Sequence, residues 1–183
     1  MEELASNYVS PRVLTAAQAT RSTILAEISR ADVAHFAAHY EVDPRSTLAS
    51  KLLLASDATQ PAHHQRSGLS AGDIYGMNLA RTRLVILAGC KTGIEQQFGG
   101  EGPVGFARSF LVAGVPVVVA SLWPVDSDAT SQLMIAFHRF RKADGLPTAL
   151  ALTHAQREIL AREHYRHPYY WAGFTTIGGH SDF

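Results

Sequence analysis

Two continuous apolar runs dominate the pattern of hydrophobic and polar positions along the chain. Residues 84–88 and 115–122 show no regular alternation of apolar with polar side chains. Runs of this kind are typical of parallel strands that are covered on both faces of a sheet. The first run ends at Gly89, so Cys90 is predicted to lie where a central strand passes into a loop. Residues 31–39 predict a third, largely buried strand.

Between these predicted strands lie segments whose apolar residues are spaced as on one face of a helix. This spacing predicts helices over residues 21–30, 103–113 and 148–164, a helix that begins at Asp128 or Thr130 and ends near residue 142, and a short helix capped by Ser70. Weaker patterns predict strands over residues 7–14, 48–54 and 169–177. Strands alternate with helices throughout, which predicts an α/β fold built on a layered sheet.

Length, charge and cysteine content narrow the class of protein. A chain of 183 residues fits one domain with a sizeable core. Its 16 basic and 16 acidic residues balance, so no broad attraction to nucleic acid or to an anionic membrane is expected. A single cysteine excludes an internal disulfide and fits a reducing compartment, so we expect a cytoplasmic protein. We expect no signal peptide and no transmembrane segment.

The candidate chemistry is a thiol and an imidazole, each at the end of a predicted strand. Cys90 follows residues 84–88, and His39 closes residues 31–39. The carboxyl ends of parallel strands meet at one edge of a sheet, so neighbouring strands would bring both side chains together there. A thiol has an ordinary pKa of about 8.5 and needs a nearby base to act as a nucleophile near neutral pH. The alternative is that the lone cysteine is inert packing.

Other motifs fit the sequence less well. Residues 88–92 lack the upstream glycine and the Gly-Lys step of a phosphate-binding loop, and they lack the flanking glycines of a hydrolase nucleophile elbow. His35 lies on the same face as His39 if the strand is regular, but the pair has no credible third metal ligand. We therefore expect neither a metal nor a cofactor.

Five segments, taken in order, resemble the successive motifs of the CHAT domain. This is a caspase-like cysteine peptidase family, related to separase and often fused to tetratricopeptide repeats. The segments are HFAAH at residues 35–39, LVILAGCKT at 84–92, GEGPVGFARSF at 100–110, ASLWPVD at 120–126 and PYYWAGF at 168–174. The resemblance implies a caspase-like three-layer sandwich in which helices flank a mostly parallel central sheet. It also implies a single domain over residues 1–183 that lacks the family's amino-terminal portion.

The resemblance further implies a cysteine endopeptidase that cleaves a protein or peptide substrate. The family's nucleophile falls on Cys90 and its catalytic histidine on His39. The backbone N–H groups of Cys90 and Tyr40 correspond to the family's oxyanion donors. Regulation by a partner or a fused repeat domain is implied, whereas direct binding to nucleic acid or to a membrane is not.

Two features leave alternatives open. Tyr40 stands where the family usually has glycine, which raises the alternative of a catalytically inactive interaction module. The family's substrate pocket falls on Ser121, Trp123, Asp126 and Asp128, and an acidic pocket would favour lysine or arginine in the substrate. The alternative for the two aspartates is that they cap the helix that follows.

Overall fold

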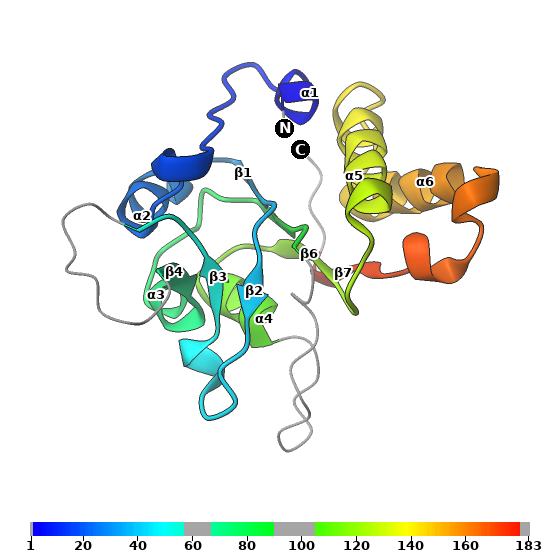
Figure 1. Cartoon of the computed structure of the whole chain (residues 1–183). Coiled ribbons are helices and arrows are strands. Elements are labelled where there is room, and N and C mark those ends of the chain that lie inside the picture. Colours follow the sequence, from blue (N-terminus) through cyan, green and yellow to red (C-terminus); the bar gives the residue numbers. More distant parts are fainter. Residues whose placement is uncertain (1, 57–66, 90–104, 180–183) are drawn as a thin grey trace.

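A four-stranded sheet forms the centre of the molecule. The computed structural model describes residues 2–56, 67–89 and 105–179. The strands lie in the order β1-β5-β6-β7, and their bounds are Val33–Phe36, Leu84–Leu87, Val117–Ser121 and Phe174–Gly178. The first three run parallel, and β7 pairs antiparallel with β6 (Figure 1). The sheet is therefore mostly parallel, as the sequence predicted.

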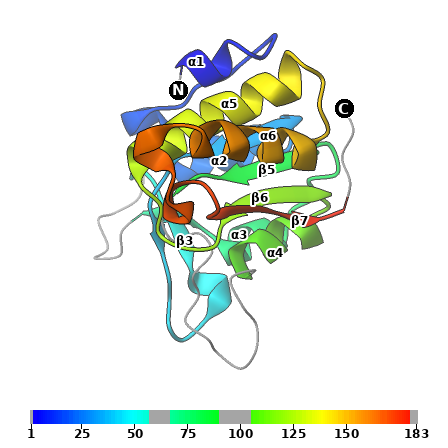
Figure 2. The same cartoon turned by 90° about the vertical axis from the view of Figure 1, so that its right-hand side faces the viewer.

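Helices cover both faces of this sheet. One face carries α2, α3 and α4, at Arg21–Ile28, Ala71–Tyr75 and Gly105–Val112. The opposite face carries α5 and α6, at Ser127–Lys142 and Thr148–Leu160, and the short α1, at Glu2–Ala5, contacts α5 (Figure 2). The predicted three-layer α/β sandwich is confirmed.

The side chains of β5 explain why its sequence is apolar at every position. Leu84 and Ile86 belong to the core cluster of the α5–α6 side, whereas Val85 and Leu87 belong to the cluster on the side of α2, α3 and α4. All four are fully buried. Successive side chains of a strand point to opposite faces, so a strand covered on both faces needs an apolar residue at each place.

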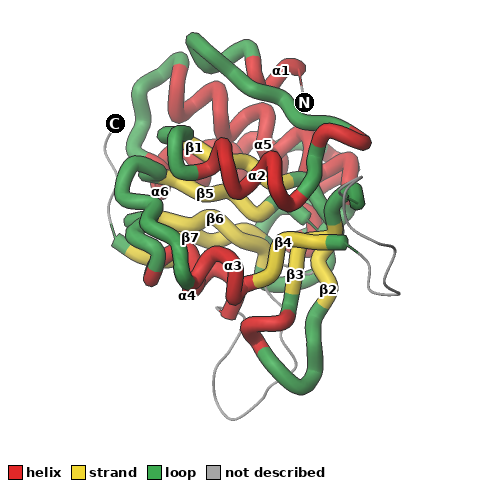
Figure 3. The backbone as a smooth tube through the Cα atoms, turned by 90° about the vertical axis from the view of Figure 1, so that its left-hand side faces the viewer, coloured by secondary structure: helices red, strands yellow, loops and turns green. Residues whose placement is uncertain are grey.

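A smaller antiparallel sheet adjoins the end of β1. It consists of β2, β3 and β4, at Tyr40–Glu41, Lys51–Leu53 and Gly68–Ser70, with β3 in the middle (Figure 3). The sequence predicted a strand around β3 but missed β2 and β4. Strands of two or three residues are too short to produce a recognisable alternation.

The predicted N-caps of two helices are confirmed, whereas one predicted strand is absent and another begins later than predicted. Thr20 caps α2, and Ser70 forms a capping box with Asp73 at the start of α3. No strand forms over residues 7–14, where the chain is irregular. Tyr169 and Tyr170 belong to a 3-10 helix, so β7 begins later than predicted. The 3-10 helices in the described residues are η1 to η4, at Ala16–Gln18, Thr47–Ala49, Glu163–Tyr165 and Pro168–Tyr170.

Among the helices in the described parts of the chain, none is both long enough and apolar enough to cross a membrane.

Candidate active site

The carboxyl ends of β1 and β5 lie side by side. Phe36 is paired with Leu87 in the parallel ladder, and the N–H of Ala88 donates to the carbonyl of Phe36 at 2.8 Å. His39 follows Phe36 by three residues. Gly89 is the last described residue before Cys90, and Cys90 itself lies outside the described residues. The two chain segments that lead to His39 and Cys90 therefore leave the sheet as hydrogen-bonded neighbours.

His39 sits at the junction between the two sheets. Its backbone carbonyl accepts a hydrogen bond from the N–H of Leu53 at 2.7 Å, while the residue as a whole is exposed. The backbone is thus held by β3, and the imidazole is accessible to a solvent molecule or a ligand.

Tyr40 directs its side chain into the core. The residue is only 7% exposed, and its ring lies 5.2 Å from the ring of Phe106, centroid to centroid. Its φ is not positive. The replacement of the family's usual glycine therefore introduces no left-handed backbone strain at this position.

The backbone N–H of Tyr40 points away from β3. The bond from Leu53 to the carbonyl of His39 makes these two residues a hydrogen-bonded pair, and Tyr40 faces Leu52 in the next pair along the ladder. Pairs alternate in an antiparallel ladder, so Tyr40 and Leu52 form a pair without mutual hydrogen bonds. The N–H of Tyr40 is therefore directed out of the smaller sheet.

Ser121 connects the end of β6 to the end of β5. Its side chain is buried, and its hydroxyl donates to the carbonyl of Gly89 at 3.3 Å. This hydrogen bond holds the peptide unit that immediately precedes Cys90 in the sequence.

Trp123 follows β6 and is held by the segment that leads into β7. Its indole N–H donates to the carbonyl of Tyr169 at 3.1 Å. A Cβ at Gly173 would lie 3.2 Å from the Trp123 ring and 2.9 Å from a methyl group of Val125. The absence of a side chain at Gly173 allows this close approach.

Asp126 and Asp128 have different surroundings. One carboxylate oxygen of Asp126 accepts from the N–H groups of Asp128 and Ala129, at 3.0 and 2.9 Å, and so caps α5. The carboxylate of Asp128 accepts from the side chains of Gln132 and Tyr165. Asp126 therefore caps α5, as one of the two alternatives predicted. Asp128 does not cap the helix; it accepts hydrogen bonds from one side chain of α5 and one of η3.

The strand ends, the motif order and this geometry agree with a comparison to known families. The chain matches the CHAT domain over residues 1–179. It belongs to the CHAT domain family. It is 26% identical over 203 residues to tetratricopeptide repeat protein 28 of Homo sapiens, and 25% identical over 204 residues to the protein of that name from Mus musculus. Each alignment covers 96% of this chain and 8% of the relative, so this CHAT domain spans a small part of the length of proteins named for such repeats.

A pair of histidines joins β1 to α5 in this CHAT domain, and the sequence did not reveal it; His138 is buried and His35 is half-buried. Nδ1 of His35, on β1, lies 2.9 Å from Nε2 of His138, on α5, and Nδ1 of His138 lies 2.6 Å from the hydroxyl of Tyr8. The spacing of α5 could have revealed that His138 is buried, because it comes four residues after the buried Met134 on the inward face of the helix, but not that its partner is His35. Among the described residues, no group of three or more potential metal ligands is placed to hold a metal ion.

Burial of this pair predicts that acid destabilises the CHAT domain. Burial, which disfavours the charged imidazolium, lowers the pKa of His35 to about 4 and that of His138 to about 3; for His138 the neighbouring His35, Arg141 and Lys142 act in the same direction. Each group is near 6.5 when unfolded, so the full stability is present above pH 6.5 and is lost as the pH falls toward the folded values. The free energy of unfolding should fall by about 2 kcal/mol between pH 6.5 and 5.5.

Denaturant unfolding at a series of pH values measures this loss. A His138→Gln variant is less stable at every pH, but it carries one titrating group fewer, so its unfolding free energy should depend less on pH in this window. An unchanged slope in the variant would contradict the assignment of the acid effect to the histidine pair.

Proposed function

We propose that this CHAT domain is a cysteine endopeptidase in which Cys90 is the nucleophile and His39 is its acid–base partner. The observation that carries the proposal is the hydrogen bond from Ala88 to Phe36, at 2.8 Å. It makes the two segments that lead to Cys90 and His39 direct neighbours at the carboxyl edge of a parallel sheet, the edge at which such sheets bind ligands.

The chemistry follows the ordinary course of a thiol peptidase. His39 accepts the proton of the Cys90 thiol, and the sulfur forms a bond to the substrate's carbonyl carbon. The backbone N–H groups of Tyr40 and Cys90 stabilise the oxyanion, an effect worth about 3 kcal/mol per donor in other enzymes. His39 then gives its proton to the departing amine as the C–N bond breaks. Water hydrolyses the thioester, which releases the acid and restores the thiol.

Two features of the described residues support these roles. The N–H of Tyr40 is directed away from β3, so it is not used within the β2–β3 ladder. The hydroxyl of Ser121 holds the carbonyl of Gly89 and so restrains the peptide before Cys90. Catalysis by positioned groups depends on restraint of this kind, because small displacements of the nucleophile are costly.

We propose a protein or peptide as the substrate and a repeat domain, fused or separate, as the regulator. The relatives are named as tetratricopeptide repeat proteins, and this chain corresponds to 8% of their length. A peptidase domain within a protein of this kind would receive its substrate or its activating signal through the repeats.

The decisive experiment compares the full-length protein with its Cys90→Ala variant. Both are incubated with a proteome-derived peptide mixture, and new amino termini are identified by mass spectrometry. We expect cleavage by the wild-type protein alone. Equal cleavage by both proteins would rule out the mechanism. Labelling by a peptidyl acyloxymethyl ketone, read as a mass increase at Cys90, should likewise occur in the wild-type protein and be absent from the variant.

The alternative of an inactive interaction module was motivated by Tyr40. The ring of that residue is buried against Phe106 and its φ is not positive, so the described geometry supplies no steric reason for inactivity. Absence of labelling at Cys90, together with retained binding to a partner, would favour the inactive module.

Substitutions of Asp126 can distinguish a role in binding a basic substrate residue from a role in capping α5. One of its oxygens caps α5, and the other makes no hydrogen bond to any of the described residues. Asp126→Asn keeps the capping acceptor, so its melting temperature should not change, but loss of the charge should slow cleavage after lysine or arginine about tenfold. Asp126→Ala also loses the cap and about 1 kcal/mol of stability. Unchanged cleavage by Asp126→Asn would assign the residue to capping alone.

A further inference from the structure

A chain of hydrogen bonds connects the N-terminal segment to the strand that precedes His39. The hydroxyl of Tyr8 lies 2.6 Å from Nδ1 of His138, and Nε2 of His138 lies 2.9 Å from Nδ1 of His35. The three residues belong to the segment after α1, to α5 and to β1. Separations of 130 and 103 residues along the chain make these contacts purely tertiary.

The bonds of His138 couple the protonation of all three side chains. A neutral imidazole carries one proton, so one ring nitrogen of His138 donates and the other accepts. If the Tyr8 hydroxyl donates to Nδ1 of His138, the proton of that ring is on Nε2, and His138 donates to Nδ1 of His35. The Tyr8 hydroxyl and the tautomers of the two histidines are therefore linked.

Among the described residues, the N-terminal segment is also attached by apolar packing and by one ion pair. Leu4 packs against the cluster on the α5–α6 side and Leu14 against the cluster on the opposite side, so the residues between them pass from one layer of the sandwich to the other. Val9 is fully exposed. Arg12 forms an ion pair with Glu27 at 3.5 Å, but its side chain is 63% exposed and such a pair contributes little.

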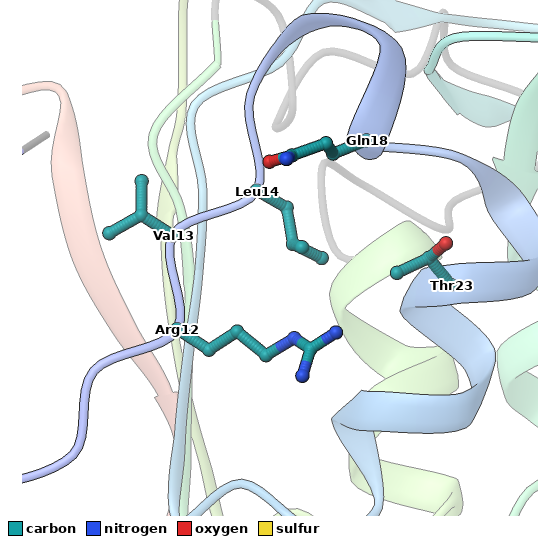
Figure 4. A pocket seen from close by; sticks show the side chains of 5 residues that line it. All are labelled: Arg12, Val13, Leu14, Gln18 and Thr23. Atoms are coloured by element: carbon teal, nitrogen blue, oxygen red, sulfur yellow. The ribbon is translucent and has the colours of Figure 1, made fainter.

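A hollow lies between the segment and α2. It has a volume of about 410 Å³ and is lined by Arg12, Val13, Leu14, Gln18 and Thr23 (Figure 4). The first four residues belong to the segment and to η1, and Thr23 belongs to α2. The described contacts that hold the segment include the packing of Leu4 and Leu14, the bonds of Tyr8, and Nζ of Lys142, which lies 5.4 Å from the centre of the Tyr8 ring.

Among the described strands, β1 lies at the edge of the main sheet and pairs with β5. Asp32 and Phe36 direct their carbonyls toward β5, so by the alternation of a strand Val33 and His35 direct their backbone groups toward the open edge. Within the described residues, these outward N–H and C=O groups of Val33 and His35 have no hydrogen-bond partner. The side chain of His35 thus provides a tie between β1 and the α5 layer, four residues before His39.

We propose that Tyr8, His138 and His35 form a latch through which the N-terminal segment positions β1 and, with it, His39. The catalytic role of His39 rests on the proposed peptidase activity. The existence of the latch does not depend on that activity. Detachment of the segment removes the proton donor of His138, releases its tautomer and weakens the tie to β1. The three are positioning residues, and a domain or partner that pulls on the segment would act on the site through them.

Hydrogen exchange in the full-length protein tests the latch. Tyr8→Phe removes only the hydroxyl, and Tyr75→Phe is the matched control, because Tyr75 is 51% exposed on α3. We expect Tyr8→Phe to speed exchange about tenfold in peptides that cover residues 2–15 and 33–41, and to leave residues 117–121 unchanged. Unchanged exchange in residues 33–41, or an equal increase in residues 117–121, would overturn the proposal.

Nitrogen-15 NMR of the histidine side chains tests the direction of the bonds. In the wild-type protein, His35 and His138 should both carry the proton on Nε2, and Tyr8→Phe should convert His138 to a mixture of tautomers. A proton on Nδ1 of His138 in the wild-type protein would overturn the latch. Neither readout involves Cys90, so a failure of peptidase activity and a failure of the latch give different results.

Discussion

Replacement of His39 by glutamine should slow the cleavage of peptides by about 10²- to 10⁴-fold at pH 7, and the alkylation of Cys90 by about thirtyfold. Without a base, a thiol with a pKa of about 8.5 is only a few per cent thiolate at that pH, and no group remains to protonate the leaving amine. His39 is exposed, so its side chain contributes little to the core. The backbone carbonyl that accepts from Leu53 is retained, and the melting temperature should therefore stay within about 2 °C.

The pH dependence of the alkylation rate tests whether His39 acts as the base for Cys90. The rate in the wild-type protein should remain appreciable well below the ordinary thiol pKa, whereas in the variant it should rise only as the pH approaches about 8.5. His164→Gln is the matched control, because His164 is exposed in η3, on the α5–α6 side of the molecule. Identical profiles for wild type and His39→Gln would contradict a Cys90–His39 dyad.

Features that depend on neighbouring residues could be predicted from the sequence. The run of β5 is apolar at every position, as a strand covered on both faces requires, and Ser70 lies three residues before the aspartate that completes its capping box. The same runs predict that His39 and Cys90 lie at strand ends; β1 ends at Phe36, three residues before His39, and Cys90 lies outside the described residues. The pairing of the two strands that precede these residues was therefore predicted from the sequence, although the bond between Ala88 and Phe36 was not.

Features that depend on tertiary contacts could not be predicted. The partner of His35 is 103 residues away, and nothing near either histidine in the sequence indicates the other. The segment around Tyr8 was predicted to be a strand, but its apolar residues Leu4 and Leu14 pack against different layers instead of forming one face. The ring of Tyr40 packs against Phe106, which is distant in the sequence. The tyrosine at this position is therefore interpreted as part of the core.

Tyr40→Ala should lower the free energy of unfolding by about 3–5 kcal/mol, the usual cost of truncating a buried aromatic residue. The ring is 7% exposed, packs against Phe106 and faces Leu52 across the β2–β3 ladder. Tyr40→Phe keeps the ring and its packing against Phe106, so it should cost much less than the alanine variant. Chemical denaturation of both variants, with wild type in the same buffer, measures the difference. Similar stabilities for Tyr40→Ala and wild type would contradict the burial of this ring.

Tyr40→Gly introduces the residue that the family usually has at this position. It distinguishes two roles for the tyrosine, a part of the core or a brake on catalysis. If the ring is part of the core, the glycine variant loses the packing of the ring and a further 0.5–1 kcal/mol or so of backbone entropy, and its activity should fall with its stability. If the tyrosine is a brake on catalysis, activity per folded molecule should rise. We expect the fall, because the side chain points toward Phe106 and not out of the sheet edge, so its removal opens a cavity in the core and leaves the path of a substrate unchanged.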